Sequence, residues 1–262
     1  LTKFLYWIKQ DKNFGFDEIF LEKKLESFRK KNKDYIYPSF NTIAGSGPNS
    51  AIIHYRSSKK TNRILKKNDI FLCDSGGQYK YGTTDVTRTV CFSKPSKKIK
   101  NIFTRVLKGH IAVAMNDLNK IKKGYLIDKK ARAALNKVNL DYGHGTGHGV
   151  GFFSNVHEGP QAISKFNSVD LKEGMIVSNE PGYYEEGKFG IRIENLVYID
   201  KVKNKLSFKN LTMAPLDKDL INDKLLNPFE KEYLLKYNLE IYQNISKYLT
   251  NNEKKWILES IQ

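Results

Sequence analysis

Apolar side chains recur every three or four positions at both ends of the chain, the period of a helix with one buried face. The face of a predicted first helix comprises Leu1, Phe4, Leu5 and Ile8. A second helix is expected before about residue 33, after a break at Asn13-Phe14-Gly15. Its apolar face comprises Ile19, Leu25 and Phe28, with charged residues elsewhere. From Pro228 to about Trp256, a helical tail is predicted from Leu234, Leu235, Leu239, Ile241 and Tyr242.

Between residues 34 and 95 the helical period gives way to β-branched and aromatic residues separated by turn residues. This pattern predicts strands at 69–74 and 82–92 and, further along the chain, at 175–180 and 190–200. Helices are expected at 96–119 and 126–139. The order helices, strands, helices, strands is typical of an α+β fold.

Composition fits a folded globular protein, because 40% of the 262 residues are apolar and 12% are aromatic. No apolar run is long enough to span a bilayer, and early lysines interrupt any signal-peptide pattern. The first residue is Leu rather than Met, so we expect a piece of a longer protein. Two cysteines form no disulfide framework, which favours a reducing compartment. Cys73 and Cys91 lie in apolar runs and are expected to be small core residues.

The net charge of +17 raises the possibility of binding to nucleic acid or to a membrane surface. The basic residues are scattered in short clusters such as Lys23-Lys24 and Lys122-Lys123, with no run of five. No aromatic-interleaved basic motif accompanies them. We therefore predict a solvated lysine surface, with neither a nucleic acid nor a membrane as partner.

Two aspartates occur where apolar sequence predicts strands. Asp74 follows Ile70-Phe71-Leu72-Cys73, so a charge there is costly unless it is paired or bound to metal. A turn-capping role beside Ser75-Gly76-Gly77 is an equally good interpretation of this residue alone. Asp85, with β-branched neighbours on both sides, is expected in mid-strand, an unusual place for an aspartate. The 11-residue spacing allows a hairpin that sets both carboxylates on one face.

His144 and His148 are four residues apart but lie among glycines at 143, 145, 147 and 149, which exclude a helical zinc pair. The glycines instead let the backbone approach a site closely. We take His148 as the better ligand candidate and His144 as a residue of the site wall.

Glu180 precedes Pro181-Gly182, and Glu194 alternates with Arg192 along a strand-like run. Residues two apart on a strand face the same side, so Arg192 and Glu194 are expected together. Taken alone, each glutamate is better interpreted as an ordinary turn or surface residue. As a set, four carboxylates and one imidazole suit divalent ions such as Mn²⁺, and carboxylates can bridge a metal pair.

Longer motifs surround these residues. They include Gly82-Thr-Thr-Asp-Val-Thr-Arg-Thr89, His144-Gly-Thr-Gly-His-Gly-Val-Gly151, Asn155-Val-His-Glu-Gly-Pro160 and Gly190-Ile-Arg-Ile-Glu-Asn195. From about Pro38 onward, the chain resembles the catalytic domain of Xaa-Pro aminopeptidases (aminopeptidase P) of the cytosolic type. This resemblance implies the pita-bread fold, a curved antiparallel sheet flanked by helices. It also implies a catalytic domain over 1–204 and a helical C-terminal extension over 205–262, packed on it. Family members of this type also have N-terminal domains, which we expect this chain not to include.

The resemblance further implies two ions, most often Mn²⁺, on Asp74, Asp85, His148, Glu180 and Glu194. Asp85 and Glu194 would bind both ions, Asp74 one of them, and His148 with Glu180 the other. Glu180 would accept a proton from the attacking water. The hydroxide that results would bridge the two ions. The implied catalytic residues are His54, His157 and Glu180, and His157 would pass a proton to the leaving proline nitrogen. Substrate would also contact His144, and Arg192 would orient the peptide or brace neighbouring acids.

The implied activity is hydrolysis of the N-terminal Xaa-Pro bond of peptides with proline in second position, by a cytoplasmic homodimer. Two alternatives stay open. One is a prolidase or methionine aminopeptidase on the same fold, and the other is a pita-bread module that binds a partner without catalysis. His110 has no role in these motifs and is expected to be a packing or surface residue.

Overall fold

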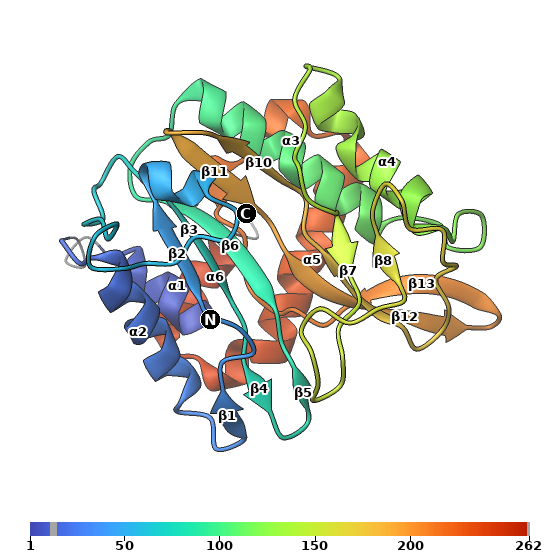
Figure 1. Ribbon diagram of the computed structural model, residues 1–262, viewed down its shortest axis with the longest axis horizontal. Helices are drawn as coiled ribbons and strands as arrows, with labels where there is room; N and C mark the ends of the chain where they lie inside the picture. Colours follow the sequence, from blue (N-terminus) through green and yellow to red (C-terminus); the bar gives the residue numbers. More distant parts are fainter. Residues whose placement is uncertain (11–14, 261–262) are drawn as a thin grey trace.

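A computed structural model describes residues 1–10 and 15–260, which fold into helices and antiparallel strands (Figure 1). The helices are α1 Thr2–Ile8, α2 Glu18–Arg29, α3 Lys97–Ala114, α4 Gly124–Asn136, α5 Pro228–Ile245 and α6 Asn251–Leu258. Short 3-10 helices are η2 Gly47–Ala51, η3 Lys218–Leu220, η4 Asp223–Leu225 and η5 Ser246–Tyr248. The strands are β1 Tyr35–Tyr37, β2 Ile43–Ser46, β3 Ile70–Ser75, β4 Gln78–Tyr79, β5 Gly82–Thr83, β6 Val86–Cys91, β7 Gly147–His148, β8 Ala162–Ile163, β9 Ile176–Asn179, β10 Gly182–Glu185, β11 Phe189–Arg192, β12 Asn195–Val202 and β13 Lys205–Asn210.

Two three-stranded antiparallel sheets, β2-β3-β6 and β13-β12-β9, form the framework. They join where the Glu194 N–H donates to the Thr87 carbonyl of β6 at 3.2 Å. On the far edge of β9, the Glu180 N–H donates to the Thr146 carbonyl at 2.7 Å, which adds the glycine-rich segment. The strands are therefore linked side by side into one irregular surface, and its seams lie next to the acidic residues singled out in the sequence.

Helices α1 and α2 cover the β2-β3-β6 sheet through a shared apolar cluster. Phe4, Leu5 and Ile8 of α1 are at most 2% exposed, which confirms the predicted face of the first helix. In α2 the buried apolar positions are Leu21 and Leu25. The break predicted at Asn13-Phe14-Gly15 falls largely outside the described residues.

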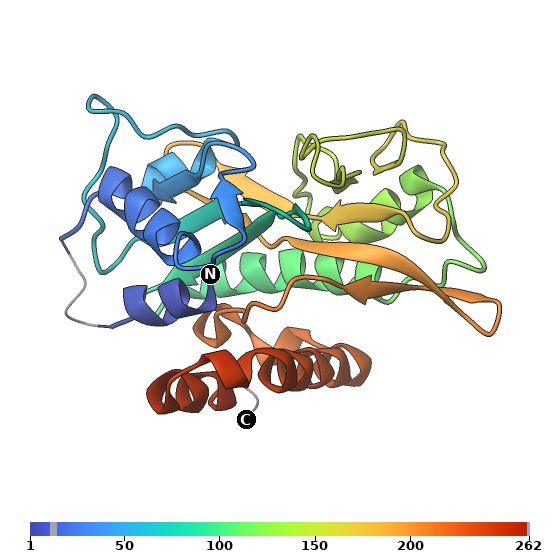
Figure 2. The ribbon, with the colours of Figure 1, turned by 90° about the horizontal axis from the view of Figure 1, so that it is seen from below.

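Helix α3 is packed between the strands and the C-terminal helices α5 and α6, which form the outermost layer in Figure 2. Its residues Phe103, Val106 and Leu107 are fully buried. Each such side chain contributes about 1.5–3 kcal/mol of burial free energy. Helix α4 lies against α3 at Gly109, where an added Cβ would be 2.3 Å from the Ala131 carbonyl oxygen.

Arg88 ties the C-terminal region to the sheet. This β6 side chain is 1% exposed, and it pairs with no carboxylate within residues 1–10 and 15–260; it donates instead to the Asn195 side-chain oxygen at 2.7 Å. Its guanidinium donates to the carbonyl oxygens of Ala214 and Pro215 and to the Tyr237 hydroxyl of α5, at 2.8–3.0 Å. It also donates to the Glu194 carbonyl at 2.6 Å. One buried cation thus joins both sheets to the C-terminal region.

Several predicted boundaries are wrong in detail. The helix expected at 96–119 ends at Ala114 and is followed by turns. Asp85 lies between β5 and β6 rather than in mid-strand, and Glu194 lies between β11 and β12. Strands β5 and β11 therefore each end shortly before one of these carboxylates. The helical tail from Pro228 is confirmed, although η5 divides it into two helices. Strand β13 pairs with β12, so a boundary at 204/205 falls in the turn of a hairpin.

Candidate metal centre and substrate cavity

Antiparallel pairing of β3 with β6 brings the two aspartates together. Asp74 lies near the end of β3 and pairs with Thr87, and Asp85 precedes the first residue of β6. One carboxylate oxygen each of Asp74, Asp85 and Glu194 lies within 4.8 Å of the others. The hairpin expected from the 11-residue spacing therefore places its carboxylates together, with Glu194 arriving from the seam between the two sheets.

Thr87 orients the groups around that seam. Its hydroxyl donates to Glu194 Oε2 at 2.8 Å and accepts from Arg192 Nε at 3.0 Å. Arg192 Nη2 donates to Asp74 Oδ2 at 2.7 Å. Arg192 and Glu194 thus face the same side, as their spacing predicts. The guanidinium braces the acids from behind, since it is 2% exposed.

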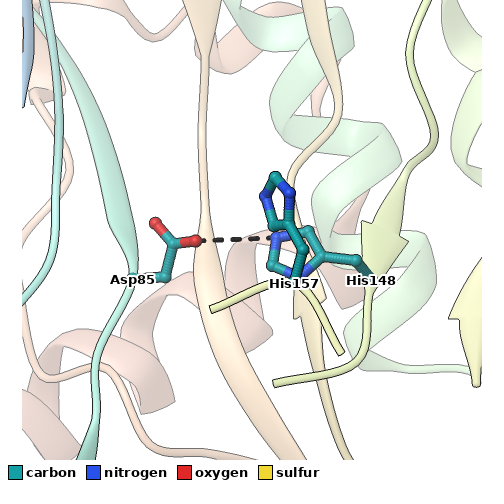
Figure 3. Close-up of side chains that lie close together, drawn as sticks. All are labelled: Asp85, His148 and His157. Carbon is teal, nitrogen blue, oxygen red and sulfur yellow. Dashed lines mark ion pairs between the residues drawn. The ribbon is translucent and has the colours of Figure 1, made fainter. Parts of the chain in front are cut away.

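His148 comes from strand β7, which pairs with β8 (Figure 3). Its Nδ1 lies 2.9 Å from the Gly149 carbonyl, so the proton belongs on Nδ1 and the Nε2 lone pair is left for a ligand. Nε2 lies 3.3 Å from Glu180 Oε1 and 3.5 Å from Asp85 Oδ2. This arrangement depends on Gly147, because an added Cβ would lie 2.0 Å from the Ser178 carbonyl of β9.

The buried negative charge of the carboxylate cluster favours the binding of cations. Burial, and then the neighbouring carboxylates, raise the pKa values of Asp85 and Glu194 well above their ordinary range. One oxygen each of Asp74 and Asp85 is buried without a hydrogen-bond partner. Buried, unpaired carboxylate oxygens are costly unless a metal binds them. Four carboxylates and one imidazole nitrogen therefore fit a pair of divalent ions in their donor chemistry.

The histidines predicted to contact substrate surround this cluster. His144 Nε2 lies 2.8 Å from the Tyr184 hydroxyl, which also accepts from Arg192 Nη1 at 2.6 Å. His157 has its ring centroid 4.0 Å from that of His148 and is exposed. Desolvation, followed by the nearby His148, lowers the pKa of His157. His54 is also exposed, and no hydrogen bond joins its side chain to any residue that the structure describes.

One cavity of about 450 Å³ unites all these groups, a size typical of small-ligand sites. The structure brings to its lining every residue singled out in the sequence: His54, Asp74, Asp85, His144, His148, His157, Glu180, Arg192 and Glu194. Phe40, Ile43, Ile53 and Val156 supply an apolar part of the wall.

Buried polar residues that support the site were missed in the sequence. On α4, Arg132 donates to the His144 carbonyl at 2.7 Å and to Asp128 at 2.8 Å. Asp128 in turn accepts from Thr146 Oγ1 at 2.7 Å, so this ion pair holds the glycine-rich segment. The i,i+4 spacing of Asp128 and Arg132 on a predicted helix was the available signal.

His110 also supports the site from behind. It is buried, with Nδ1 3.0 Å from the Asn179 carbonyl, next to Glu180. Asn179 Nδ2 donates in return to the His110 carbonyl at 2.9 Å. Burial lowers the pKa of His110 to about 3, so the ring is neutral in the folded chain. Of the two expectations for His110, packing is correct and surface exposure is wrong.

Family comparisons agree with this geometry. The model described as metallopeptidase family M24 matches residues 1–201, and that of the C-terminal region of peptidase M24 matches residues 204–262. The chain belongs to metallopeptidase family M24. The α+β pita-bread fold expected from the motifs is thereby confirmed, as is the family resemblance.

Among M24 relatives, a probable Xaa-Pro aminopeptidase P of Laccaria bicolor is 45% identical over 98% of this chain and 42% of its own length. One from Paracoccidioides brasiliensis is 41% identical over 100% of this chain and 45% of its own. The chain thus spans less than half the length of these relatives.

Solved M24 structures match as well. The X-prolyl aminopeptidase of Caenorhabditis elegans, described as a cytosolic enzyme with a di-nuclear active site, superposes with a TM-score of 0.94 at 35% identity. The match covers 100% of this chain and 45% of the Caenorhabditis elegans chain. Prolidase from Pyrococcus furiosus has a TM-score of 0.70 at 29% identity, with 80% of this chain and 60% of that chain covered.

Proposed function

We propose that this chain is the catalytic part of an Xaa-Pro aminopeptidase that hydrolyses the N-terminal Xaa-Pro bond of peptides. The observation that carries the proposal is the convergence of five metal-ligand side chains and four substrate-handling residues on one cavity. Similarity over the whole chain to an X-prolyl aminopeptidase with a di-nuclear site supports it.

Asp74, Asp85, His148, Glu180 and Glu194 would hold two ions, for which we propose Mn²⁺ because oxygen donors predominate. When bound, such ions polarise a carbonyl and acidify water. Orphaned oxygens on Asp74 and Asp85 support this assignment.

Proton transfer falls to residues that the cavity exposes. Glu180 is positioned to accept a proton, because among the described residues it forms no ion pair with a lysine or arginine; its partners are the imidazoles of His148 and His144, at 3.3 and 3.9 Å. His157, with its pKa lowered, is neutral at pH 7 and can accept and then donate a proton. His54 and His144 would contact the peptide, and Arg192 would keep Asp74 and Tyr184 in place.

The apolar wall of the cavity suits a proline ring. Proline lacks an N–H and holds its backbone in one conformation, so recognition relies on shape and apolar contact. Phe40, Ile43, Ile53 and Val156 offer such a surface beside the cluster.

Hydrolysis of an Xaa-Pro-Yaa tripeptide with added Mn²⁺ tests the proposal, with Glu194→Ala as the inactive comparison. Release of the first residue, abolished by the substitution, is expected. Equal activity in both proteins would refute the metal assignment.

A prolidase is the second candidate, favoured by the structural match to the Pyrococcus furiosus enzyme over 80% of the chain. Xaa-Pro dipeptides assayed beside tripeptides separate the two, because cleavage of dipeptides alone would select the prolidase. A non-catalytic binding module would bind no Mn²⁺ in a metal titration.

The remaining expectations are proposals as well. We propose a homodimer in the cytoplasm, supported by the cytosolic description of the Caenorhabditis elegans enzyme for its location only. No helix within residues 1–10 and 15–260 combines the length and apolarity needed to cross a membrane. The division into 1–204 and 205–262 also stays a proposal, and so does the prediction that no nucleic acid binds.

A further inference from the structure

The segment that follows η2 forms part of the cavity wall and is anchored on both sides of Arg56. Tyr55 is 3% exposed, and its hydroxyl donates to Glu18 Oε2 at 2.7 Å. On the other side, Ser57 Oγ donates to Glu22 Oε2 at 2.8 Å. Both partners belong to helix α2, so the backbone of Arg56 is held by a rigid element.

The side chain of Arg56, in contrast, has no partner among the residues that the structure describes. It is exposed and lines the cavity, and no hydrogen bond or ion pair joins it to any residue within the described part of the chain. Other arginines of this region are engaged: Arg192 pairs with Asp74, and Arg132 pairs with Asp128. A fixed backbone that presents five free N–H donors to a cavity is prepared for an acceptor from outside the chain.

The described lining of the cavity offers Arg56 no carboxylate outside the metal cluster. Among the described residues that line it, the carboxylates are Asp74, Asp85, Glu180 and Glu194, which form the metal cluster. The neighbouring loop adds positive charge at Lys59 and Lys60, which are exposed. Glu18 and Glu22, the anchors of this segment, do not line the cavity, so an anionic group that enters next to Arg56 meets no acid of the described lining beyond the cluster.

We propose that Arg56 binds a carboxylate of the peptide substrate, so that the site prefers peptides with a free carboxylate over neutral ones; the proposal rests on the peptidase function proposed above. A guanidinium donates two parallel hydrogen bonds to a carboxylate, which gives geometric selectivity as well as attraction. Two sources have this chemistry: the free C-terminal carboxylate of a short peptide, and the side chain of an aspartate or glutamate in a longer one.

Four peptides distinguish these sources: Ala-Pro-Ala, Ala-Pro-Ala amide, Ala-Pro-Glu amide and Ala-Pro-Gln amide. If the terminal carboxylate is bound, Ala-Pro-Ala should exceed its amide in kcat/KM by about tenfold, as a charge-assisted hydrogen bond at an exposed site provides. If an acidic side chain is bound, the same ratio should separate the glutamate amide from the glutamine amide.

Substitution assigns the preference to one residue. Arg56→Ala should reduce the ratio to about one by raising KM rather than lowering kcat, since ground-state binding is lost. Arg56→Lys should restore part of it, because charge is kept without the planar fork. Lys60 lies on the same loop but does not line the cavity. Lys60→Ala therefore removes one positive charge without changing the cavity wall, and it should leave the ratio unchanged.

Ratios near one in the wild-type chain, or ratios that survive Arg56→Ala, would overturn the proposal while leaving the peptidase function intact. If Lys60→Ala reduced the kcat/KM ratio as much as Arg56→Ala does, the proposal would also be overturned. The preference would then come from the general positive charge of the loop. If no peptide is cleaved, the peptidase function fails. Calorimetric binding of the same four peptides to the Glu180→Gln chain, with and without Arg56→Ala, then decides whether Arg56 selects carboxylates.

Discussion

The floor and the rim of the cavity are built in opposite ways. The floor comprises Asp74, Asp85, Arg192 and Glu194, all of which are at most 8% exposed. The rim comprises His54, Arg56 and His157, all of which are exposed. In the floor, Thr87 links Glu194 to Arg192, and Arg192 in turn pairs with Asp74.

This difference separates two tasks. A buried carboxylate cluster has a high cost of desolvation, which metal ions and a fixed set of donors offset, so the floor tolerates little change. The rim contributes little to folding and is free to vary with the substrate. Substitutions in the floor should therefore affect stability and chemistry together, whereas substitutions in the rim should affect chemistry or selectivity alone.

The largest effect is expected from Glu194→Gln in the floor. Loss of a buried carboxylate ligand should lower kcat/KM on an Xaa-Pro-Yaa peptide by at least about a thousandfold, because charge stabilisation by the metals is lost. The metal-free variant should at the same time unfold at a higher temperature than the metal-free wild type, since burial disfavours the charged form of Glu194. Glu173→Gln, on an exposed turn, serves as the control and should change neither. If Glu194→Gln retained activity, Glu194 would not be a metal ligand that the reaction needs.

Arg88→Met tests whether the floor depends on the layer beneath it. The substitution leaves several buried carbonyl groups without a donor, including that of Glu194. It should reduce the free energy of unfolding by about 3–5 kcal/mol, measured by urea denaturation. Arg105→Met is the matched control, because that side chain is only partly buried and donates to the Ala134 carbonyl. Equal losses in the two variants would show that the network around Arg88 has no special weight.

His157→Ala examines the rim. If this residue transfers a proton, kcat should fall by about a hundredfold, the lower range for general acid–base catalysis. The thermal midpoint should not change, since the side chain is exposed. A substantial drop in the midpoint would contradict the distinction between floor and rim at this position.

The effect that is smallest near neutral pH concerns His110, which supports the floor from behind. Because burial lowers the pKa of His110 from 6.5 to about 3, the unfolded chain binds a proton below pH 6.5 that the folded chain refuses. The free energy of unfolding should therefore decrease as pH falls from 6.5 toward 3, with about 1.4 kcal/mol per pH unit from this residue. His110→Gln should show a shallower slope in urea denaturation over this window. Identical slopes would show that His110 titrates normally in the fold.

Local sequence predicted the floor well and its support poorly. Asp74 alone was ambiguous, because a charge after four apolar residues either requires a partner or caps a turn, and only its combination with the longer motifs favoured the first interpretation. Asp85 and Glu194 were assigned to strands because β-branched residues continue on both sides, and the breaks arise only from the meeting of two sheets. Strand β13 was not expected, since its lysines and asparagines hide the alternation of a half-exposed hairpin.

The supporting residues could not be predicted for a different reason. Arg88 reaches Pro215 across 127 positions, and His110 reaches Asn179 across 69. Such contacts leave no periodic trace in the sequence. Glu18 and Arg29 illustrate the same limit, because both were expected on the charged side of α2 and both are buried. Glu18 accepts from Ser46, Asn49 and Tyr55, and Arg29 donates to Ser75.

The Arg88 network has a consequence for the order of assembly during synthesis. The carbonyl of Glu194 is held by a side chain that also requires Ala214, Pro215 and Tyr237. A ribosome-bound chain that has emerged only to Glu194 contains all five ligands but lacks the residues that hold the last one. Contacts this distant in sequence form late in folding. The nascent chain should therefore acquire tight metal binding at the proposed site only once α5 has emerged and packed.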